Sequence, residues 1–465
     1  MKILKDHQKK VVNYISKNEN RGILIIHDTG TGKTLTGVAS IFEILKKNKK
    51  NVIIITPVTL TENWKKEIID FNGSIPTNFT FLTFQSLAKI NICEVCLDSI
   101  IIIDEVHNLR TPVEAFFLNV KGITKYILEN EIKKFPMYEL ALQPGEKTKK
   151  LTPDLANLFE LYNIPKYIVS IPKKGIYAYY NMLCALNAFK LLLLTATPII
   201  NGYKDLDNIF KMFYKIPNMA SINELEAIIV KFKIPISYYF INKTPENGYP
   251  FYNIFRISVP MTEEEKLIYY KFEKNIKLNL TAMNELRIKA NTEVALEFYS
   301  PKIRYILDRL KKKYLKTLIY SFFIDKGMDP VYKMLIEKGS LKKEEVFMIT
   351  GSTKIEQRQK IVDEFNKLPT GVMIISSAGR EGIDLKGVRY VFLLEPGWND
   401  SSDHQALSRA VRYKSHAHLP LDEQKVDVFR LMLKGTIDDF LFNRFVVPKK
   451  IKSETFMKLC KKYSI

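Results

Sequence analysis

The sequence predicts an α/β protein with two mainly parallel β-sheets, each flanked by helices. Apolar runs of four to six residues alternate with amphipathic stretches of helical length, the pattern of β-α-β units. The alternation occurs once in the first half of the chain and again in the second half. A chain of 465 residues is long enough for several domains, so we expect two such α/β domains.

In the first half, the predicted strands are short, apolar and rich in β-branched residues. They cover Ile23 to Ile26, Val52 to Ile55, Phe81 to Thr83, Ile100 to Ile103 and Leu191 to Leu194. The helices expected between them include Thr34 to Lys46 and Glu62 to Ile69.

In the second half, the same criteria predict another series of strands. They cover Thr317 to Tyr320, Val346 to Ile349, Val372 to Ile375, Val388 to Leu394 and Val426 to Arg430. The helices expected between them lie near Asp329 to Glu337, Ile355 to Asn366 and His404 to Val411.

These elements predict the domain boundaries. The first domain is expected over residues 1–225 and the second over residues 301–447, with a linker and the start of the second lobe at 226–300. Prolines interrupt the alternation between about residues 111 and 180, which predicts an insertion in the first domain. Residues 448–465 hold six lysines and one acid, so a basic tail is expected, either solvated or bound to phosphates.

Composition limits the class of partner. The formal net charge of +21 favours a polyanion such as nucleic acid, although an AT-rich genome also enriches lysine. Four cysteines argue against a disulfide framework, and the lone pair Cys93 and Cys96 lacks companions for a metal site. No apolar run approaches the ~20 residues of a membrane helix, so a soluble intracellular protein without a membrane partner is expected.

A glycine-rich segment follows the first predicted strand and opens a helix, the context that identifies a phosphate loop. Its glycines let backbone N–H groups turn toward phosphate oxygens, and the helix N-terminus favours an anion. Lys33 is expected to neutralise the β- and γ-phosphates, and Thr34 to offer its hydroxyl to Mg²⁺. The segment consists of His27, Asp28, Thr29, Gly30, Thr31, Gly32, Lys33 and Thr34.

Two carboxylates follow a strand of four isoleucines. Asp104 and Glu105 are therefore expected at the carboxyl edge of the sheet, where ligands bind in open α/β folds. Asp104 suits Mg²⁺, directly or through water, and Glu105 suits polarisation of the attacking water.

A glutamine and two arginines occur in the second half with helical spacing. Gln405, Arg409 and Arg412 are at i, i+4 and i+7, so we expect them on one helix face. Arginines stabilise the charge of a transferring phosphoryl group and can come from a neighbouring domain. These residues and the phosphate loop predict an ATP site that is shared between the two domains.

In this order the motifs resemble the superfamily 2 helicase-like ATPases, outside the insertion and the tail. The matching segments are HDTGTGKT from His27 (motif I), DEVH from Asp104 (motif II), TATP from Thr195 (motif III), SSAGREGIDL from Ser376 (motif V) and QALSRAVR from Gln405 (motif VI). The segments that begin at Pro57 with Trp64, at Ile349, at Glu395 with Trp398 and at Thr436 resemble the Swi/Snf-type branch, which tracks along duplex DNA.

A subgroup is closer still. His27, Ile236 to Tyr239 and Arg409 to Pro420 resemble the nucleoside triphosphate phosphohydrolase and early transcription factor ATPases of poxviruses and other large cytoplasmic DNA viruses. Cytoplasmic linear plasmids carry relatives of this subgroup. The sequence departs from the family's pattern at two places. Ser408 stands where many relatives have glycine, and the insertion in the first domain is long.

The resemblance implies two RecA-like domains and further site residues. Gln8 would read adenine, and Gly382 and Asp384 would contact the nucleotide and the opposite domain. His107 and the segment Thr195, Ala196 and Thr197 would couple the nucleotide to domain motion. The nucleic-acid face would include Thr56, Pro57, Thr83, Phe84, Gln85, Ser321 and Gly351.

The function expected from these residues is an ATP- and Mg²⁺-dependent translocase or helicase, acting on DNA in viral-type transcription or genome processing. The resemblance implies a cytoplasmic location, in the host cell or in a virion, with transcription proteins as further partners. Two alternatives stay open: a DExH-type RNA helicase, which shares the DEVH segment, and a transcription-complex subunit that uses ATP only as a switch.

Overall fold

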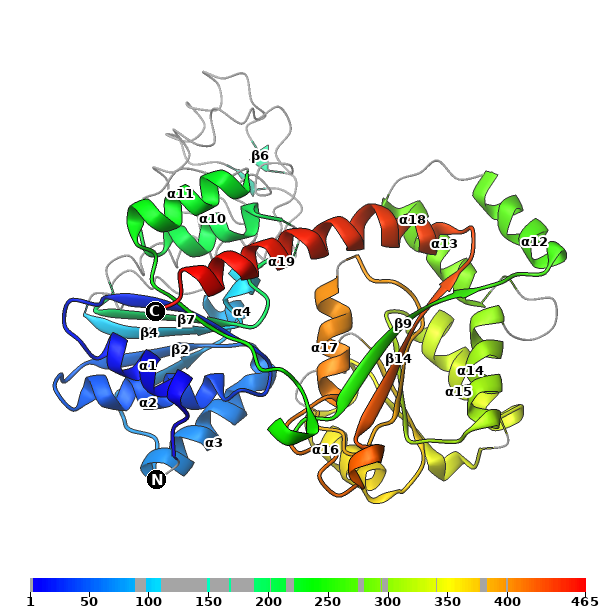
Figure 1. Ribbon diagram of the computed structural model, residues 1–465, viewed down its shortest axis with the longest axis horizontal. Helices are drawn as coiled ribbons and strands as arrows, with labels where there is room; N and C mark the ends of the chain where they lie inside the picture. Colours follow the sequence, from blue (N-terminus) through cyan, green and yellow to red (C-terminus); the bar gives the residue numbers. More distant parts are fainter. Residues whose placement is uncertain are drawn as a thin grey trace. The chain divides into compact units, whose positions relative to one another are not determined.

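The computed structural model describes most of the chain outside the predicted insertion. The described residues are 3–87, 98–109, 149–150, 167–168, 188–200, 202–214, 221–274, 280–292, 294, 300–339, 341–376, 383–398 and 400–465. They form two compact units, one made of residues 1–240 and 452–465 and the other of residues 241–451. Figure 1 shows a central sheet with helices on both sides in each unit. The predicted fold class is confirmed.

The first unit is built on a six-stranded sheet in which all pairs are parallel. In spatial order, the strands are β3 (Phe79–Leu82), β2 (Asn51–Ile55), β4 (Ser99–Asp104), β7 (Lys190–Thr195), β1 (Gly22–His27) and β8 (Ile236–Tyr239). Strands β1, β4 and β7 are buried along their whole length, which explains why they read as continuous apolar runs.

Alternate residues of these strands enter two separate hydrophobic cores because side chains on a strand point to opposite faces. Ile23 and Ile25 pack with α1 (Asp6–Ile15), α2 (Lys33–Leu45) and α3 (Thr61–Asn72). Leu24 and Ile26 face the other core, with α10 (Lys204–Lys211) and α11 (Ile222–Phe232). Figure 1 shows these two helix layers on opposite faces of the sheet. The short helix α4 (Phe84–Leu87) follows β3.

Residues 452–465, which were expected in a basic tail, belong instead to the first compact unit. Helix α19 spans Val447–Lys462, and its Phe456 and Cys460 are fully buried in the same core as α10 and α11. After the helix, Ile465 N–H donates to the Ile236 carbonyl (2.9 Å), next to β8. The many lysines of this segment favoured a tail over a packed helix. Phe456 and Cys460 are nevertheless at i and i+4 and so share one helix face.

The second unit repeats the architecture with another parallel six-stranded sheet. Its strands, in spatial order, are β11 (Val346–Ile349), β12 (Val372–Ser376), β10 (Thr317–Ser321), β13 (Tyr390–Leu393), β14 (Lys425–Leu433) and β9 (Phe251–Val259). One face is covered by α13 (Leu280–Thr292), α14 (Pro301–Lys312), α15 (Asp329–Glu337) and α18 (Ile437–Leu441). The other is covered by α16 (Ile355–Lys367) and α17 (Asp400–Ala410), while α12 (Glu263–Lys274) adds Tyr269 to the first of these cores.

The division between the units differs from the predicted boundary. The first unit runs to Phe240 instead of residue 225, because α11 and β8 complete its core and its sheet. Strand β9, which was expected in a linker, is the edge strand of the second sheet. Its exposed Phe251, Ile254 and Phe255 remove the alternation that would have marked it as a strand.

Of the predicted insertion, the structure describes one antiparallel pair, β5 (Lys149–Lys150) with β6 (Tyr167–Ile168). The other residues of the predicted insertion lie outside the described residues, and so do Cys93 and Cys96. In the part of the chain that is described, no helix is both long and apolar enough to cross a membrane.

Candidate active site

Three neighbouring strands of the first unit end at one edge of the sheet, and a predicted motif follows each strand at that edge. Strand β7 lies between β1 and β4. In the parallel register, Thr195 is beside Ile26 and Asp104 is beside Leu194. The phosphate loop after β1, motif III after β7 and the carboxylates after β4 are therefore brought together at the carboxyl edge, where open α/β sheets bind ligands.

The phosphate loop has the backbone conformation that its glycines predict. Gly30 (φ 76°) and Gly32 (φ 83°) are in the left-handed region, which glycine enters without steric cost. Helix α2 begins directly afterwards at Lys33. The Lys33 ammonium group donates to the carbonyls of His27 (3.1 Å) and Asp28 (3.2 Å), so it lies over the loop. This arrangement places a cation and a helix N-terminus where phosphates bind.

Gln8 lies against the same loop, as the resemblance implied. Its side-chain amide donates to the Gly32 carbonyl (3.1 Å) and accepts from the Lys5 N–H (2.8 Å). A Cβ atom at position 32 would lie 2.6 Å from Gln8 Nε2 and would displace the amide, and the φ of 83° at this position also favours glycine.

His7 and Tyr239 also adjoin the loop, and the sequence did not single out either side chain. Their rings are stacked, with centroids 3.6 Å apart, and His7 Nε2 is 3.2 Å from the Thr31 carbonyl oxygen. The ring of His27 meets both rings edge-on. Burial lowers the pKa of His27 to about 3, helped by His7 and Lys33, so its imidazole is neutral at physiological pH. The signal available was the segment Ile236 to Tyr239, which was noted only as a family likeness.

Asp104 is buried at the end of β4 and its carboxylate is held at both oxygens. The indole N–H of Trp64 donates to Oδ2 (2.8 Å), and the Glu105 N–H donates to Oδ1 (3.0 Å). Burial raises the pKa of Asp104, and the Glu105 carboxylate raises it further. The Trp64 hydrogen bond and the Lys33 charge act in the opposite direction.

Glu105, His107 and Thr195 form a polar chain between motif II and motif III. Glu105 Oε2 is 3.2 Å from His107 Nδ1, which in turn is 3.1 Å from Thr195 Oγ1. Thr195 Oγ1 also accepts from the Thr197 N–H (3.0 Å), and Ala196 between them is buried. A shift of the Glu105 carboxylate can therefore reach the loop after β7 through three contacts.

The motif VI residues lie in the second unit, on and just after α17. Gln405 and Arg409 are one helical turn apart and half-buried. The expectation that Arg412 shares their helix face is wrong, because α17 ends at Ala410. Arg412 Nη1 instead donates to the Ile383 carbonyl (3.0 Å), and Nε is 3.5 Å from Asp384 Oδ1. Gly382 lies outside the described residues.

Two of the residues expected on a nucleic-acid face do not offer their hydroxyl groups to a ligand. Thr56 is buried, with its N–H donated to the Leu82 carbonyl, and Ser321 is buried at the end of β10. Pro57, Thr83 and Phe84 are half-buried, and Gly351 is exposed. Gln85 lies on α4, and its side chain is outside the described part. A face made of these residues would contact phosphates without Thr56 and Ser321 hydroxyls.

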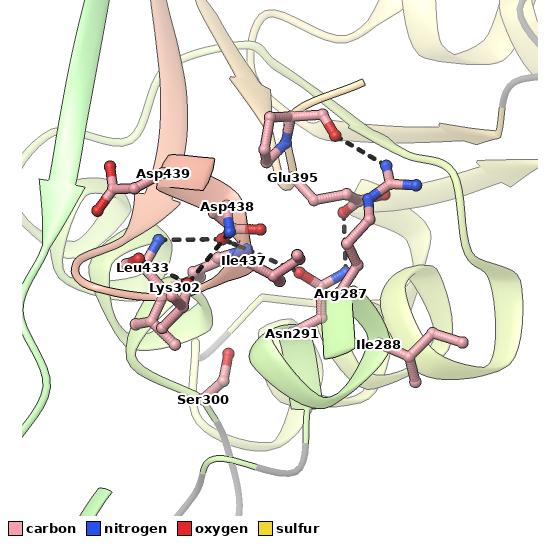
Figure 2. A network of polar contacts seen from close by, with 12 residues as sticks. Arg287, Ile288, Asn291, Ser300, Lys302, Glu395, Leu433, Ile437, Asp438 and Asp439 are labelled. Carbon is pink, nitrogen blue, oxygen red and sulfur yellow. Dashed lines mark hydrogen bonds and ion pairs between the residues drawn. The ribbon is translucent and has the colours of Figure 1, made fainter. Parts of the chain in front are cut away.

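Ser321 belongs to a buried polar network that supports the carboxyl edge of the second sheet. Its hydroxyl donates to Glu395 Oε1 (3.0 Å), and Asn291 donates to Glu395 Oε2 (2.9 Å). Lys302 links Asn291 Oδ1 (2.9 Å) to Asp438 Oδ2 (2.5 Å), as Figure 2 shows. A buried charge needs such pairing, so the network fixes the loop after β13 relative to α13, α14 and α18.

Comparisons with known proteins agree with this geometry. The family profile described as "SNF2-related domain" matches residues 7–103, and the one described as "Helicase conserved C-terminal domain" matches residues 301–414. The first match contains Gln8, the phosphate loop and Trp64, and the second contains Gln405, Arg409 and Arg412.

Several relatives align along most of the chain. A putative ATP-dependent RNA helicase of Acanthamoeba polyphaga mimivirus is 28% identical over 92% of this chain and 88% of its own length. A termination factor NPH-I homolog of African swine fever virus is 23% identical, over 89% and 70%. A killer plasmid pGKL-2 helicase of Kluyveromyces lactis is 22% identical, over 90% and 62%.

Among solved structures, the Sulfolobus solfataricus SWI2/SNF2 ATPase core in complex with dsDNA is similar over 99% of this chain and 95% of that chain. Its sequence identity is 18% and its TM-score is 0.37. The two matched domains, the relatives and the assembled motifs agree: the chain contains an SNF2-related domain and a helicase conserved C-terminal domain, and it is a helicase-like ATPase.

Proposed function

We propose that this protein uses ATP hydrolysis to move along a nucleic acid, with duplex DNA as its preferred polymer. The observation that carries the proposal is the meeting of the phosphate loop, Thr195 and the Asp104–Glu105 pair at one sheet edge. The SNF2-related match, which includes the Trp64 segment, supports duplex DNA.

Mg²⁺ fits the donor groups that the described residues supply. Among them, no cluster of three or more His, Cys, Asp or Glu side chains could hold a metal ion by itself. Mg²⁺ in nucleotide enzymes usually takes one or two protein ligands and completes its shell with phosphate oxygens and water. The Asp104 carboxylate and the Thr34 hydroxyl would hold it, and it would neutralise charge on the β- and γ-phosphates.

The chain's own residues then have separate tasks. Lys33 would leave the loop carbonyls to which it donates and bind the phosphates. Glu105, fixed next to His107, would orient the attacking water and accept its proton. Gln8 is placed to read the base, because its amide already lies against the loop at Gly32.

Hydrolysis is proposed to need residues of both units. The first unit holds the carboxylates and the phosphate loop, whereas Gln405, Arg409 and Arg412 are in the second. Arginine supplied from another domain stabilises charge on a transferring phosphoryl group. This division of labour would couple hydrolysis to relative movement of the units.

The contact with nucleic acid is proposed to be electrostatic and independent of sequence. The net charge of +21 favours phosphates, and backbone-directed contacts carry no base information. Pro57, Thr83, Phe84, Gln85 and Gly351 remain the proposed contact positions, and the hydroxyls of Thr56 and Ser321 are left out for the reason given above.

The relatives suggest the setting. A termination factor homolog of African swine fever virus and a plasmid helicase are among them, which supports a role in cytoplasmic transcription or genome processing. Proteins of the transcription machinery are the proposed further partners.

RNA is the competing polymer, because two relatives that align over 92% and 91% of this chain carry the description "putative ATP-dependent RNA helicase". The deciding experiment measures ATPase turnover with duplex DNA, single-stranded DNA and RNA at one fixed salt concentration, since phosphate binding depends steeply on salt. We expect the largest stimulation from duplex DNA. Strong stimulation by RNA alone would replace this proposal with an RNA helicase. Stimulation only by a transcription protein would indicate an ATP switch.

A further inference from the structure

Trp64 lies on a helix that packs on one face of the first sheet, and its side chain also contacts Asp104 of the candidate active site. Its side chain on α3 is fully buried, and its indole N–H donates to Asp104 Oδ2 at 2.8 Å. The other oxygen, Oδ1, accepts from the Glu105 N–H at 3.0 Å. With one donor on each oxygen, rotation of the carboxylate about its last bond is restricted.

Gly37 provides the space that Trp64 occupies. It is in the interior of α2, one turn after Lys33, where glycine costs about 1 kcal/mol relative to alanine. A Cβ atom at this position would lie 2.6 Å from Trp64 Cη2, a distance that side-chain packing does not tolerate. The helix that begins at the phosphate loop therefore carries a notch for the indole ring.

We propose that Trp64 is a positioning residue for Asp104, and that Gly37 is the notch that makes this position available. The indole N–H holds the carboxylate in the orientation that a nucleotide-bound divalent cation requires. Both oxygens keep lone pairs for the cation or for a water on it, because a carboxylate oxygen can accept more than one contact. The inference rests on the proposed role of Asp104 as the cation's ligand.

The alternative is that Trp64 only packs in the core and that Asp104 merely satisfies a buried N–H group. The two readings differ in what removal of the N–H does. Groups that orient a metal ligand typically change metal affinity by 10- to 100-fold when they are removed. A packing residue would lower stability without changing the dependence on the cation.

The first test is Trp64→Phe in the full chain, which keeps an aromatic ring and removes the donor. We expect the Mg²⁺ concentration for half-maximal turnover to rise about 10-fold or more. Binding of ADP with Mg²⁺, measured by calorimetry, should weaken, while binding of ADP in EDTA should stay unchanged. Ile68→Val is the matched control, because Ile68 is buried on the same helix, in the same hydrophobic core as Trp64, and its side chain has no hydrogen-bond donor.

The second test is Gly37→Ala, which keeps the donor but fills the notch, and whose helix propensity favours folding. We expect the same rise in the Mg²⁺ requirement. In the Trp64→Phe background the alanine should add little, because phenylalanine lacks the outer ring atom that it would meet. Such non-additivity is what a shared contact produces.

The outcomes separate this inference from the proposed function. Unchanged Mg²⁺ dependence in both Trp64→Phe and Gly37→Ala, with Asp104→Asn strongly impaired, would overturn the role of Trp64 alone. Normal Mg²⁺ dependence in Asp104→Asn would remove the cation site on which the inference rests. Equal weakening of ADP binding with and without Mg²⁺ in Trp64→Phe would show that Trp64 acts only through packing.

Discussion

Glu105 has an uncommon backbone conformation for its residue type. Its φ of 53° is in the left-handed region, which costs a glutamate free energy that the surrounding fold must supply. This conformation turns the side chain, one residue after β4, toward His107, where Oε2 is 3.2 Å from Nδ1. We interpret the conformation as the means by which the protein aims the carboxylate that is proposed to orient water.

Replacement of Glu105 by glutamine keeps the shape and the backbone requirement but removes the base. We expect Glu105→Gln to bind ATP normally and to turn over about 10²-fold more slowly, the usual contribution of a general base. Steady-state ATPase rates and nucleotide binding check this, with the exposed Glu62→Gln as control. Turnover near that of the wild type would exclude Glu105 as the base.

His416 follows Arg412 and is predicted to make the second unit sensitive to acid. It is buried, with Nε2 2.7 Å from the Val388 carbonyl oxygen and Nδ1 2.9 Å from Ser415 Oγ. Burial lowers the pKa of His416 to about 4, and the charges on Arg389, His418 and Lys316 add to this while the Val388 contact opposes it.

Between pH 6.5 and about 4, the unfolded chain binds a proton at His416 that the folded chain does not. The free energy of unfolding therefore falls as pH falls through this window, by about 2 kcal/mol between pH 7 and pH 5. We expect His416→Gln, which can still donate to Val388, to reduce this slope in urea unfolding. The exposed His418→Gln should retain most of it, and equal slopes in His416→Gln and wild type would contradict the assignment.

At the scale of elements, helix α19 packs in the core of the first unit, which its lysine-rich composition does not indicate. Its lysines are mostly exposed, while Phe456 and Cys460 complete the hydrophobic core of the first unit. Lys462 Nζ and the Tyr463 hydroxyl both contact Glu226 Oε1 on α11, at 2.9 and 2.7 Å. The helix is therefore part of the fold of the first unit.

Truncation of the buried ring tests this placement. Phe456→Ala should lower the free energy of unfolding of the first unit by about 3–5 kcal/mol, through lost burial and the cavity left behind. Lys458→Ala, exposed on the same helix, should leave stability within about 0.5 kcal/mol. Equal stability of the two variants, measured by urea unfolding, would show that the helix does not pack in solution.

At the scale of the whole molecule, the first unit is assembled from both ends of the chain. Residues 1–240 and 452–465 belong to it, so the chain passes between the units twice. A fragment that ends near Tyr214 would lack β8 and the buried end of α19, and would not represent the unit. Tests of cooperation between the units therefore require the full chain.

Arg409→Ala and Arg412→Ala test that cooperation. Each variant should bind nucleotide like the wild type, because the phosphate loop is in the other unit. The residue that acts on the phosphoryl group should lose about 10³-fold in turnover when it is replaced. Lys386→Ala, an exposed cation near Asp384, is the matched control. Wild-type turnover in both arginine variants would show that the second unit does not contribute to hydrolysis.

Much of the fold and of the candidate site could be predicted from the sequence, because the apolar runs and the motifs that follow them indicated the same elements. Strands such as β4 and β7 are buried along their length, so unbroken runs of isoleucine and leucine marked them. The phosphate loop and the Asp104–Glu105 pair were recognisable because each follows such a strand directly. Helix α15 has the predicted bounds, Asp329 to Glu337.

Tertiary structure decided the features that depend on contacts between distant segments. The exposed edge strand β9 has no hydrophobic alternation, and only its pairing with β14 reveals it. The sequence predicted a tail for the lysine-rich α19. Its two buried residues can be recognised as core residues only from the core that they share with α10 and α11. The hydrogen bond from Trp64 to Asp104 joins residues 40 positions apart, and the notch at Gly37 is visible only when α2 packs on α3. Local periodicity reports which face of an element is buried, whereas the partner on that face is set by the packing of the whole unit.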